Sequence, residues 1–208
     1  MAQNPTGRLA LSSDGPHLAL GRAHEAFGPS RRVLAAMAAA RLAGPVIWIR
    51  GPWAEGAPCA DGLAGFFDPG RIVLVECRRG VEALWAAEEA LRSGAAPLVA
   101  LEPDAPPALT PVRRLTLAAQ ASMRGGARAP APPLCLILTP TGGAAPAVQT
   151  RWRVDPLPGW ARAGGAPRWR LELLRDKAGP PDAWEACGPP PRRALGLARL
   201  GPQFRRAA

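Results

Sequence analysis

Residues 72–101 read IVLVECRRGVEALWAAEEALRSGAAPLVAL, which is a complete strand–helix–strand unit. The runs at 72–75 and 98–101 are short and continuously apolar, a pattern typical of strands that are buried on both faces. Between them, residues 81–92 carry large side chains at helical spacing, and Trp85 is expected on the buried side of this helix. Because a helix that links two strands of one sheet favours parallel pairing, the unit predicts an α/β fold.

The same alternation continues on both sides of this unit. Helices are expected at 31–43 and 110–122, where apolar residues recur every three or four positions. The second helix is expected to start with Thr110 as its N-cap and Pro111 in its first position. Further strands are expected at the short apolar runs 46–49 and 134–138 and at residues 23–27, which a Gly-Pro-Ser turn ends. Strands that alternate with helices predict a mostly parallel sheet flanked by helices.

Beyond the last of these runs, the pattern changes to alternating apolar and charged residues, at 151–154, 169–174 and 183–186. Such alternation is typical of antiparallel strands with one exposed face. These segments are therefore expected to extend the sheet as a C-terminal antiparallel β-meander. Their tryptophans, like Trp85, either pack in the core or offer rings on which nucleic-acid bases stack, and core packing is the favoured interpretation.

The two ends of the chain differ in composition from its middle. Residues 1–21 have no sustained period and contain several glycines and prolines, so they are expected to form a flexible leader. Residues 188–208 contain three consecutive prolines, five arginines and no acid, which predicts a disordered basic tail. Residues 22–187 then form one α/β domain.

The charge of the chain is strongly positive. It has 26 basic and 16 acidic residues, a formal charge of +10, and all the basic residues except Lys177 are arginines. From residue 151 onward there are 12 basic and 5 acidic residues. The guanidinium fork suits phosphate and carboxylate, so the excess favours a polyanion or an acidic protein as partner.

Five arginines of the tail are candidates for such contacts, and two interpretations stay open. They bind the phosphates of single-stranded DNA weakly and without sequence preference, or they belong to a short apolar helix that docks on a protein. The five are Arg192, Arg193, Arg199, Arg205 and Arg206.

Several classes of protein are excluded. No run of the sequence approaches the roughly 18 apolar residues of a membrane span, and the first 20 residues lack the order of a signal peptide, so a soluble cytoplasmic protein is expected. The four cysteines have no C-x-x-C spacing, and two histidines are too few for a metal site or a catalytic triad. Neither a metal nor a cofactor is expected.

Two loops and one acid are candidates for a nucleotide site. Residues 51–56 have the glycine spacing of a phosphate-binding loop, but the Lys and Ser or Thr that should follow are absent. Gly28-Pro29-Ser30-Arg31-Arg32 leads into a helix N-terminus, which attracts anions, although a tight turn is the simpler interpretation. Glu102 ends a strand where nucleotide-hydrolysing sheets place a magnesium-binding carboxylate, or it serves solubility alone.

Arg113 and Arg114 are a further candidate. Val112 and Leu115 belong to the buried stripe of their helix, which leaves both arginines to face solvent or the sheet edge. They either contact a partner or pair with an internal acid.

Two runs of residues are distinctive together: LWAAEEALRSG at 84–94 and RRLTLAA at 113–119. With the shorter runs HEAFGP, GPVIWI, FDPGRIVLV and TRWRV, they resemble the ImuA family of damage-inducible mutagenesis proteins, which are related to RecA and to the division inhibitor SulA. The resemblance covers roughly residues 22–187. It implies a RecA-like fold in which Gly28 to Arg32 replaces the phosphate loop and Glu102 corresponds to the acid of the Walker B strand.

The resemblance also implies a function and partners. The expected function is that of a non-catalytic accessory protein in error-prone translesion DNA synthesis, part of DNA damage tolerance and SOS mutagenesis. The expected partners are the Y-family-like protein ImuB, an error-prone DNA polymerase III alpha-type subunit, and RecA. Two alternatives stay open: a divergent ATPase that binds ATP through Arg31, Arg32 and Glu102, and a SulA-like inhibitor of cell division.

Overall fold

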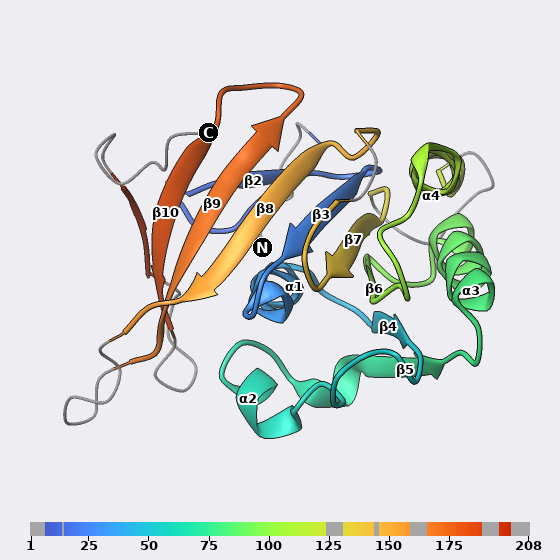
Figure 1. Ribbon diagram of the computed structural model, residues 1–208, viewed down its shortest axis with the longest axis horizontal. Coiled ribbons are helices and arrows are strands. Elements are labelled where there is room, and N and C mark those ends of the chain that lie inside the picture. Colours follow the sequence, from blue (N-terminus) through green and yellow to red (C-terminus); the bar gives the residue numbers. More distant parts are fainter. Residues whose placement is uncertain are drawn as a thin grey trace.

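The computed structural model describes residues 7–13, 15–123, 131–143, 146–158, 166–188 and 196–200. Within these residues lies a nine-stranded sheet with the strand order β11-β10-β9-β8-β3-β7-β6-β4-β5 (Figure 1). Its strands are β3 (Ala23–Phe27), β4 (Val46–Arg50), β5 (Ile72–Glu76), β6 (Leu98–Leu101), β7 (Leu134–Thr139), β8 (Thr150–Pro156), β9 (Arg168–Asp176), β10 (Asp182–Cys187) and β11 (Gly196–Arg199). A separate small sheet pairs β1 (Arg8–Ala10) with β2 (His17–Ala19), and the helices are α1 (Arg31–Arg41), α2 (Ala60–Ala64), η1 (Pro69–Arg71), α3 (Gly80–Ser93) and α4 (Leu109–Ala121).

The large sheet has a parallel half and an antiparallel half. Strands β5, β4, β6, β7, β3 and β8 pair in parallel, and β8, β9, β10 and β11 continue the sheet in antiparallel register. This confirms the expected α/β class, with a mostly parallel sheet flanked by helices and a C-terminal antiparallel extension. Among the described helices, none is long and apolar enough to cross a membrane.

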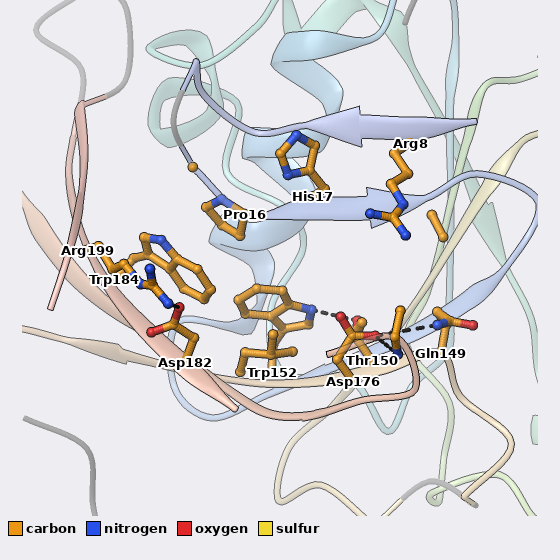
Figure 2. A pocket seen from close by; sticks show the side chains of 14 residues that line it. Arg8, Pro16, His17, Gln149, Thr150, Trp152, Asp176, Asp182, Trp184 and Arg199 are labelled. Atoms are coloured by element: carbon orange, nitrogen blue, oxygen red, sulfur yellow. Dashed lines mark hydrogen bonds and ion pairs between the residues drawn. The ribbon is translucent and has the colours of Figure 1, made fainter. Parts of the chain in front are cut away.

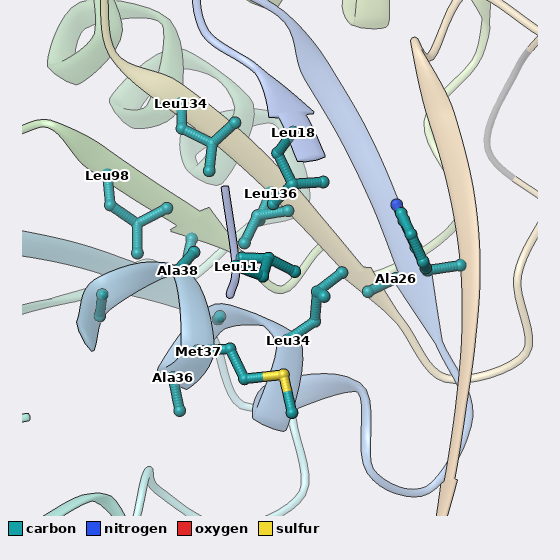
Figure 3. Close-up of a cluster of buried hydrophobic side chains, with 14 of the residues drawn as sticks. Leu11, Leu18, Ala26, Leu34, Ala36, Met37, Ala38, Leu98, Leu134 and Leu136 are labelled. Carbon is teal, nitrogen blue, oxygen red and sulfur yellow. The ribbon is translucent and has the colours of Figure 1, made fainter. Parts of the chain in front are cut away.

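The two faces of the sheet carry separate apolar cores. Helix α1 lies on one face, where Leu34 and Met37 pack with Leu11 and Leu18 from the β1–β2 segment (Figure 3). Helices α3 and α4 lie side by side on the other face (Figure 1) and bury small side chains such as Ala87 against it. Both faces of the central strands are therefore covered, as their continuous apolar runs predicted.

The expectation of a leader without regular structure is wrong for residues 8–10 and 17–19, because β1 and β2 form an antiparallel pair with buried leucines. A chain of hydrogen bonds fixes this pair to the large sheet. Trp152 Nε1 donates to Thr150 Oγ1 at 2.7 Å, Thr150 Oγ1 lies 2.6 Å from His24 Nδ1, and His24 Nε2 lies 2.9 Å from the Ala19 carbonyl oxygen. Since a carbonyl only accepts, the network assigns the proton of His24 to Nε2. Residues 1–6 lie outside the described part of the chain.

Two apolar features predicted as buried are exposed. Strand β5 is the edge of the sheet with β4 as its neighbour, so Val73 and Leu74 are 51% and 43% exposed instead of covered. On α3, the small residues Ala83 and Ala87 face the sheet, which turns Trp85 outward and leaves it 58% exposed. The periodic pattern predicted the positions of both elements correctly. The prediction that the largest side chains of the helix form its buried face was wrong.

Two boundaries also differ from expectation. Helix α4 starts at Leu109 with Ala108 as its N-cap, so Thr110 does not cap it and Pro111 is its third residue. In the segment expected to be disordered, residues 196–199 form strand β11, which pairs with β10. Leu197 of this strand packs against the core on the α1 face.

Candidate functional site

Strands β4 and β6 are neighbours whose chains continue to opposite faces of the sheet. From β4 the chain runs to α2, whose Leu63 packs in the same core as α1, whereas from β6 it runs to α4 on the other face. At such a point, open α/β sheets bind their ligands beyond the carboxyl ends of the strands. This part of the sheet edge is therefore the candidate site.

Glu102 directly follows β6 at this edge, and its residue is 2% exposed. Its Oε1 accepts hydrogen bonds from Arg32 Nε and from Trp48 Nε1, each at 2.8 Å. Its Oε2 accepts from Arg32 Nη2, also at 2.8 Å. The carboxylate thus has a bidentate, charge-assisted contact with a guanidinium and a third bond from an indole.

Arg32 lies in the first turn of α1 and makes further contacts. Its Nη2 also donates to the carbonyl oxygens of Glu55 and Gly56, both at 2.8 Å. A single side chain therefore joins the turn at 28–32, the loop at 51–56 and Glu102. The sequence marked these three features separately, and the structure brings them together.

The backbone of the turn before α1 is occupied by contacts within the protein. Gly28 N donates to Pro140 O, Ser30 N donates to Val154 O, and Arg31 N donates to Gly28 O. Gly28 has a φ of 97°, and a Cβ there would lie 2.8 Å from the carbonyl oxygen of Val154, so only glycine fits. These amides hold strands and turn together and do not form the set of free donors that cradles a phosphate.

Trp53 covers the neighbouring loop. Its Nε1 donates to the carbonyl oxygen of Glu102 at 2.9 Å, and a Cβ added to Gly51 would lie 2.3 Å from its ring. Sequence reasoning missed the roles of Trp48 and Trp53, because nothing in a single sequence shows which tryptophan reaches the end of β6. Together with Arg32, they surround Glu102 with donors.

Arg31, the other arginine of the turn, takes no part in this arrangement. It is buried, 9% exposed, and its Nη1 donates to the Gly28 carbonyl oxygen at 3.3 Å. The chemistry available at the edge is thus an ion pair between Arg32 and Glu102, in which the acid is already neutralised and both of its oxygens are engaged.

Comparison of the sequence with known proteins identifies its family. No protein-family model matches the chain. It is 33% identical over 157 residues to the protein named ImuA from each of two strains of Caulobacter vibrioides, an alignment that covers 69% of this chain. The chain belongs to the ImuA family. It spans 60% of the length of these curated relatives.

The second notable surface of this ImuA-family chain lies between α3 and α4. Val81 and Trp85 stand on its α3 side, 47% and 58% exposed, and Pro111 lies on its α4 side. Between the helices is a cavity of about 140 Å³ that also reaches Leu84 and Leu115. We call this surface the α3–α4 groove. Exposed apolar side chains gathered in one concave place are typical of protein contact sites.

Arg113 and Arg114 are both exposed on α4, as their position in the sequence predicted. Arg114 Nη2 lies 2.7 Å from Glu88 Oε2 of α3, so this arginine has the internal partner that one of the two interpretations required. Glu88 also pairs with Arg92. Arg113 makes no ion pair within the described residues. The two neighbours therefore lie in different surroundings.

Of the five tail arginines, Arg199 lies in the described part of the ImuA-family chain, in strand β11. Its Nη2 is 2.5 Å from Asp182 Oδ2. The pair lies at one end of a cavity of about 340 Å³ between the β1–β2 pair and strands β8 to β11, where Trp152 and Trp184 stand next to each other (Figure 2). Arg192, Arg193, Arg205 and Arg206 lie outside the described residues.

Proposed function

We propose that this chain is a non-catalytic, RecA-like accessory protein of an error-prone translesion synthesis complex, acting in DNA damage tolerance through contacts with other proteins. The observation that carries the proposal is the pairing of Glu102 with Arg32 at the switch point of the sheet. A hydrolase of this architecture needs that carboxylate to position magnesium, and it needs a lysine and free amides to position the phosphates.

In this chain, the carboxylate and the amides that would have to do this are already bonded to other groups of the protein. Both oxygens of Glu102 are hydrogen-bonded to donors of the same chain, and a magnesium ion would have to displace a guanidinium from the carboxylate. The amides of Gly28, Ser30 and Arg31 donate to carbonyl oxygens of the same chain. Since positioning is most of what such sites contribute to catalysis, these contacts favour a structural role for the edge.

The partners proposed are those that the family resemblance implies: ImuB, an error-prone DNA polymerase III alpha-type subunit, and RecA. The α3–α4 groove supports a role that depends on protein contacts, because an exposed tryptophan beside an arginine is the composition that dominates binding energy at interfaces.

A divergent ATPase is the second candidate, and the position of Glu102 at the carboxyl end of β6 favours it. Steady-state hydrolysis of ATP with magnesium separates the two candidates. The proposal expects no turnover above the buffer blank from the wild-type chain and from Glu102→Gln alike. Turnover that Glu102→Gln abolishes would replace the proposal with the ATPase.

The accessory role is tested by co-expression with the ImuB homologue of the same organism and size-exclusion chromatography of the mixture. The proposal expects the two chains to elute together as one complex. Separate elution at micromolar concentrations, with both chains folded, would contradict it.

A further inference from the structure

Four cations gather near the amino end of β3. They are Arg22, Arg113, Arg175 and Lys177. We call them the basic cluster. They come from four separate places in the chain: the residue before β3, the first half of α4, the end of β9 and the turn after it.

Hydrogen bonds place these segments next to one another. Ala23 N donates to Thr116 Oγ1 at 3.3 Å, which fixes α4 beside the start of β3, one helical turn from Arg113. Gln149 N donates to Ala23 O at 2.8 Å, and Lys177 N donates to Gln149 O at 3.1 Å. Gln149, next to the start of β8, therefore lies between Lys177 and Ala23, the residue that follows Arg22.

The side chain of Lys177 is also held in place, since its Nζ donates to the Ala147 carbonyl oxygen at 2.7 Å. Arg175 lies opposite Arg151 in the pairing of β9 with β8. Burial lowers the pKa of Lys177, and the charges of Arg175, Arg22 and Arg113 lower it further. The three arginines are therefore close enough to Lys177 for their charges to act on its ammonium group.

The acids near this place are engaged elsewhere. Glu25 is buried, and its carboxylate accepts from Thr139 Oγ1 and from Arg151 Nε. Asp176 stands between Arg175 and Lys177, but side chains alternate along a strand, so it points to the opposite face, where it accepts from Ala178 N at 2.9 Å. Within the described residues, none of the four members of the basic cluster makes an ion pair.

We infer that the basic cluster is a binding surface for the phosphate backbone of a nucleic acid. Repulsion between Lys177 and the three arginines is relieved when a polyanion lies across them, and arginine forks and a lysine ammonium are the groups that contact phosphates. The four side chains offer charge and no base-reading geometry, so the contact should be independent of sequence. An acidic protein is the other partner that such a surface would attract.

This surface differs from the tail arginines and from the α3–α4 groove, so the inference goes beyond the proposed function and does not depend on it. The site also lies at the amino end of β3, whereas the Arg32–Glu102 pair lies beyond the carboxyl ends of the parallel strands. Nucleic-acid binding here would leave the contacts of that pair intact.

The test is fluorescence anisotropy of a labelled oligothymidine of about 20 nucleotides, titrated with the full chain at several salt concentrations. Four phosphate contacts on a single strand predict a slope of log affinity against log salt of roughly −2.8. Arg175→Ala combined with Lys177→Ala is expected to reduce the size of this slope by about 1.4, because two contacts are lost.

The matched control is Arg41→Ala combined with Arg78→Ala, which removes the same charge from two exposed arginines away from the basic cluster. It is expected to leave the slope and the affinity near the wild-type values. Equal losses in both double variants would show that only net charge matters and would overturn the inference. No binding by the wild-type chain at low salt would overturn it as well and leave an acidic protein as the partner of this surface.

A second measurement uses the fact that Lys177 is the single lysine of the chain. An amine-reactive reagent then modifies Lys177 and the terminal amine, which serves as an internal reference. The inference expects the oligonucleotide to slow modification of Lys177 several-fold relative to the terminal amine. Equal rates with and without the oligonucleotide, under conditions where it is bound, would place the contact elsewhere.

Discussion

The carboxyl edge of the parallel sheet and the α3–α4 groove differ in whether their main side chains are paired within the protein. At the edge, Glu102 is buried and every oxygen of its carboxylate has a donor from the same chain. In the groove, Trp85 is 58% exposed. The difference indicates which region is complete in itself and which gains from a partner, because buried polar groups are stable only when paired, whereas large exposed apolar groups gain free energy on being covered.

The largest expected effect is on the edge. Arg32→Ala leaves Glu102 buried with the indole of Trp48 as its remaining side-chain donor, so the free energy of unfolding should fall by about 3–4 kcal/mol, the lower part of the range for broken buried pairs because Arg32 is 26% exposed. Chemical denaturation measures this loss.

Replacing both partners is the matched control for Arg32→Ala. Arg32→Met combined with Glu102→Gln removes the uncompensated charge and should recover about half or more of the lost stability. If Arg32→Ala alone unfolds no more readily than the wild type, the pair does not hold the edge together and the comparison fails on this side.

Acid should destabilise the protein through His24 on the α1 face of the sheet. The groove lies on the other face and should not contribute to this effect. Burial lowers the pKa of His24 from 6.5 to about 4, against the opposing effect of its hydrogen bond to Ala19. Between pH 6.5 and pH 4, His24 is therefore protonated in the unfolded chain but not in the folded chain. The free energy of unfolding falls as the pH drops through this range. The expected loss is about 3 kcal/mol, at about 1.4 kcal/mol per unit.

Denaturation midpoints at pH 7 and pH 4.5 measure the effect of His24. His24→Asn should have a smaller difference between the two pH values than the wild type, while His17→Asn, which changes an exposed histidine, should keep the wild-type difference. An unchanged difference in His24→Asn would assign the acid response to other groups.

A substitution in the groove should weaken partner binding and leave stability almost unchanged, the opposite of a substitution at the edge. Trp85→Ala removes the largest exposed anchor of α3 and should weaken binding of the ImuB homologue by about 2 kcal/mol, close to 30-fold, while thermal stability changes by less than about 0.5 kcal/mol. Leu117→Ala is the control, because Leu117 is 63% exposed on α4 and does not line the groove. Equal affinities of the wild type and Trp85→Ala would remove the groove from the proposed function.

The smallest effects concern the two arginines of α4. Arg114→Ala breaks an ion pair whose arginine is 55% exposed, so stability should fall by less than about 1 kcal/mol. Arg113→Ala should leave stability unchanged within about 0.5 kcal/mol. If the two variants together fold normally and bind the ImuB homologue with wild-type affinity, these arginines have no part in the protein interface.

Sequence patterns predicted the elements of this fold well because burial and period are local signals. The run Leu98 to Leu101 is buried over its whole length, and the alternation around Trp152 gave the antiparallel extension. The order of strands is not local. Residues 72–76 have the composition of a central strand, so the pattern could not show that they form an edge strand.

The candidate site was predicted in pieces. Gly28 to Arg32, the loop at 51–56 and Glu102 were each visible from residue types and spacing, but their meeting depends on how β4 and β6 are placed in the sheet. The direction of Trp85 was missed because hydrophobicity suggests burial, whereas packing put the small alanines of α3 against the sheet. Strand β11 was missed because prolines and arginines around it suggest disorder, and its pairing depends on β10.

The claim that the carboxyl edge is closed by the chain's own side chains is tested most directly by titrating the wild-type chain with a fluorescent ATP analogue in the presence of magnesium. The account predicts no saturable binding at concentrations up to about 1 mM, the upper end of ordinary Michaelis constants. Saturable binding in the micromolar range that is lost in Glu102→Gln would contradict it, because Glu102 would then be free to serve a nucleotide while Arg32 is present.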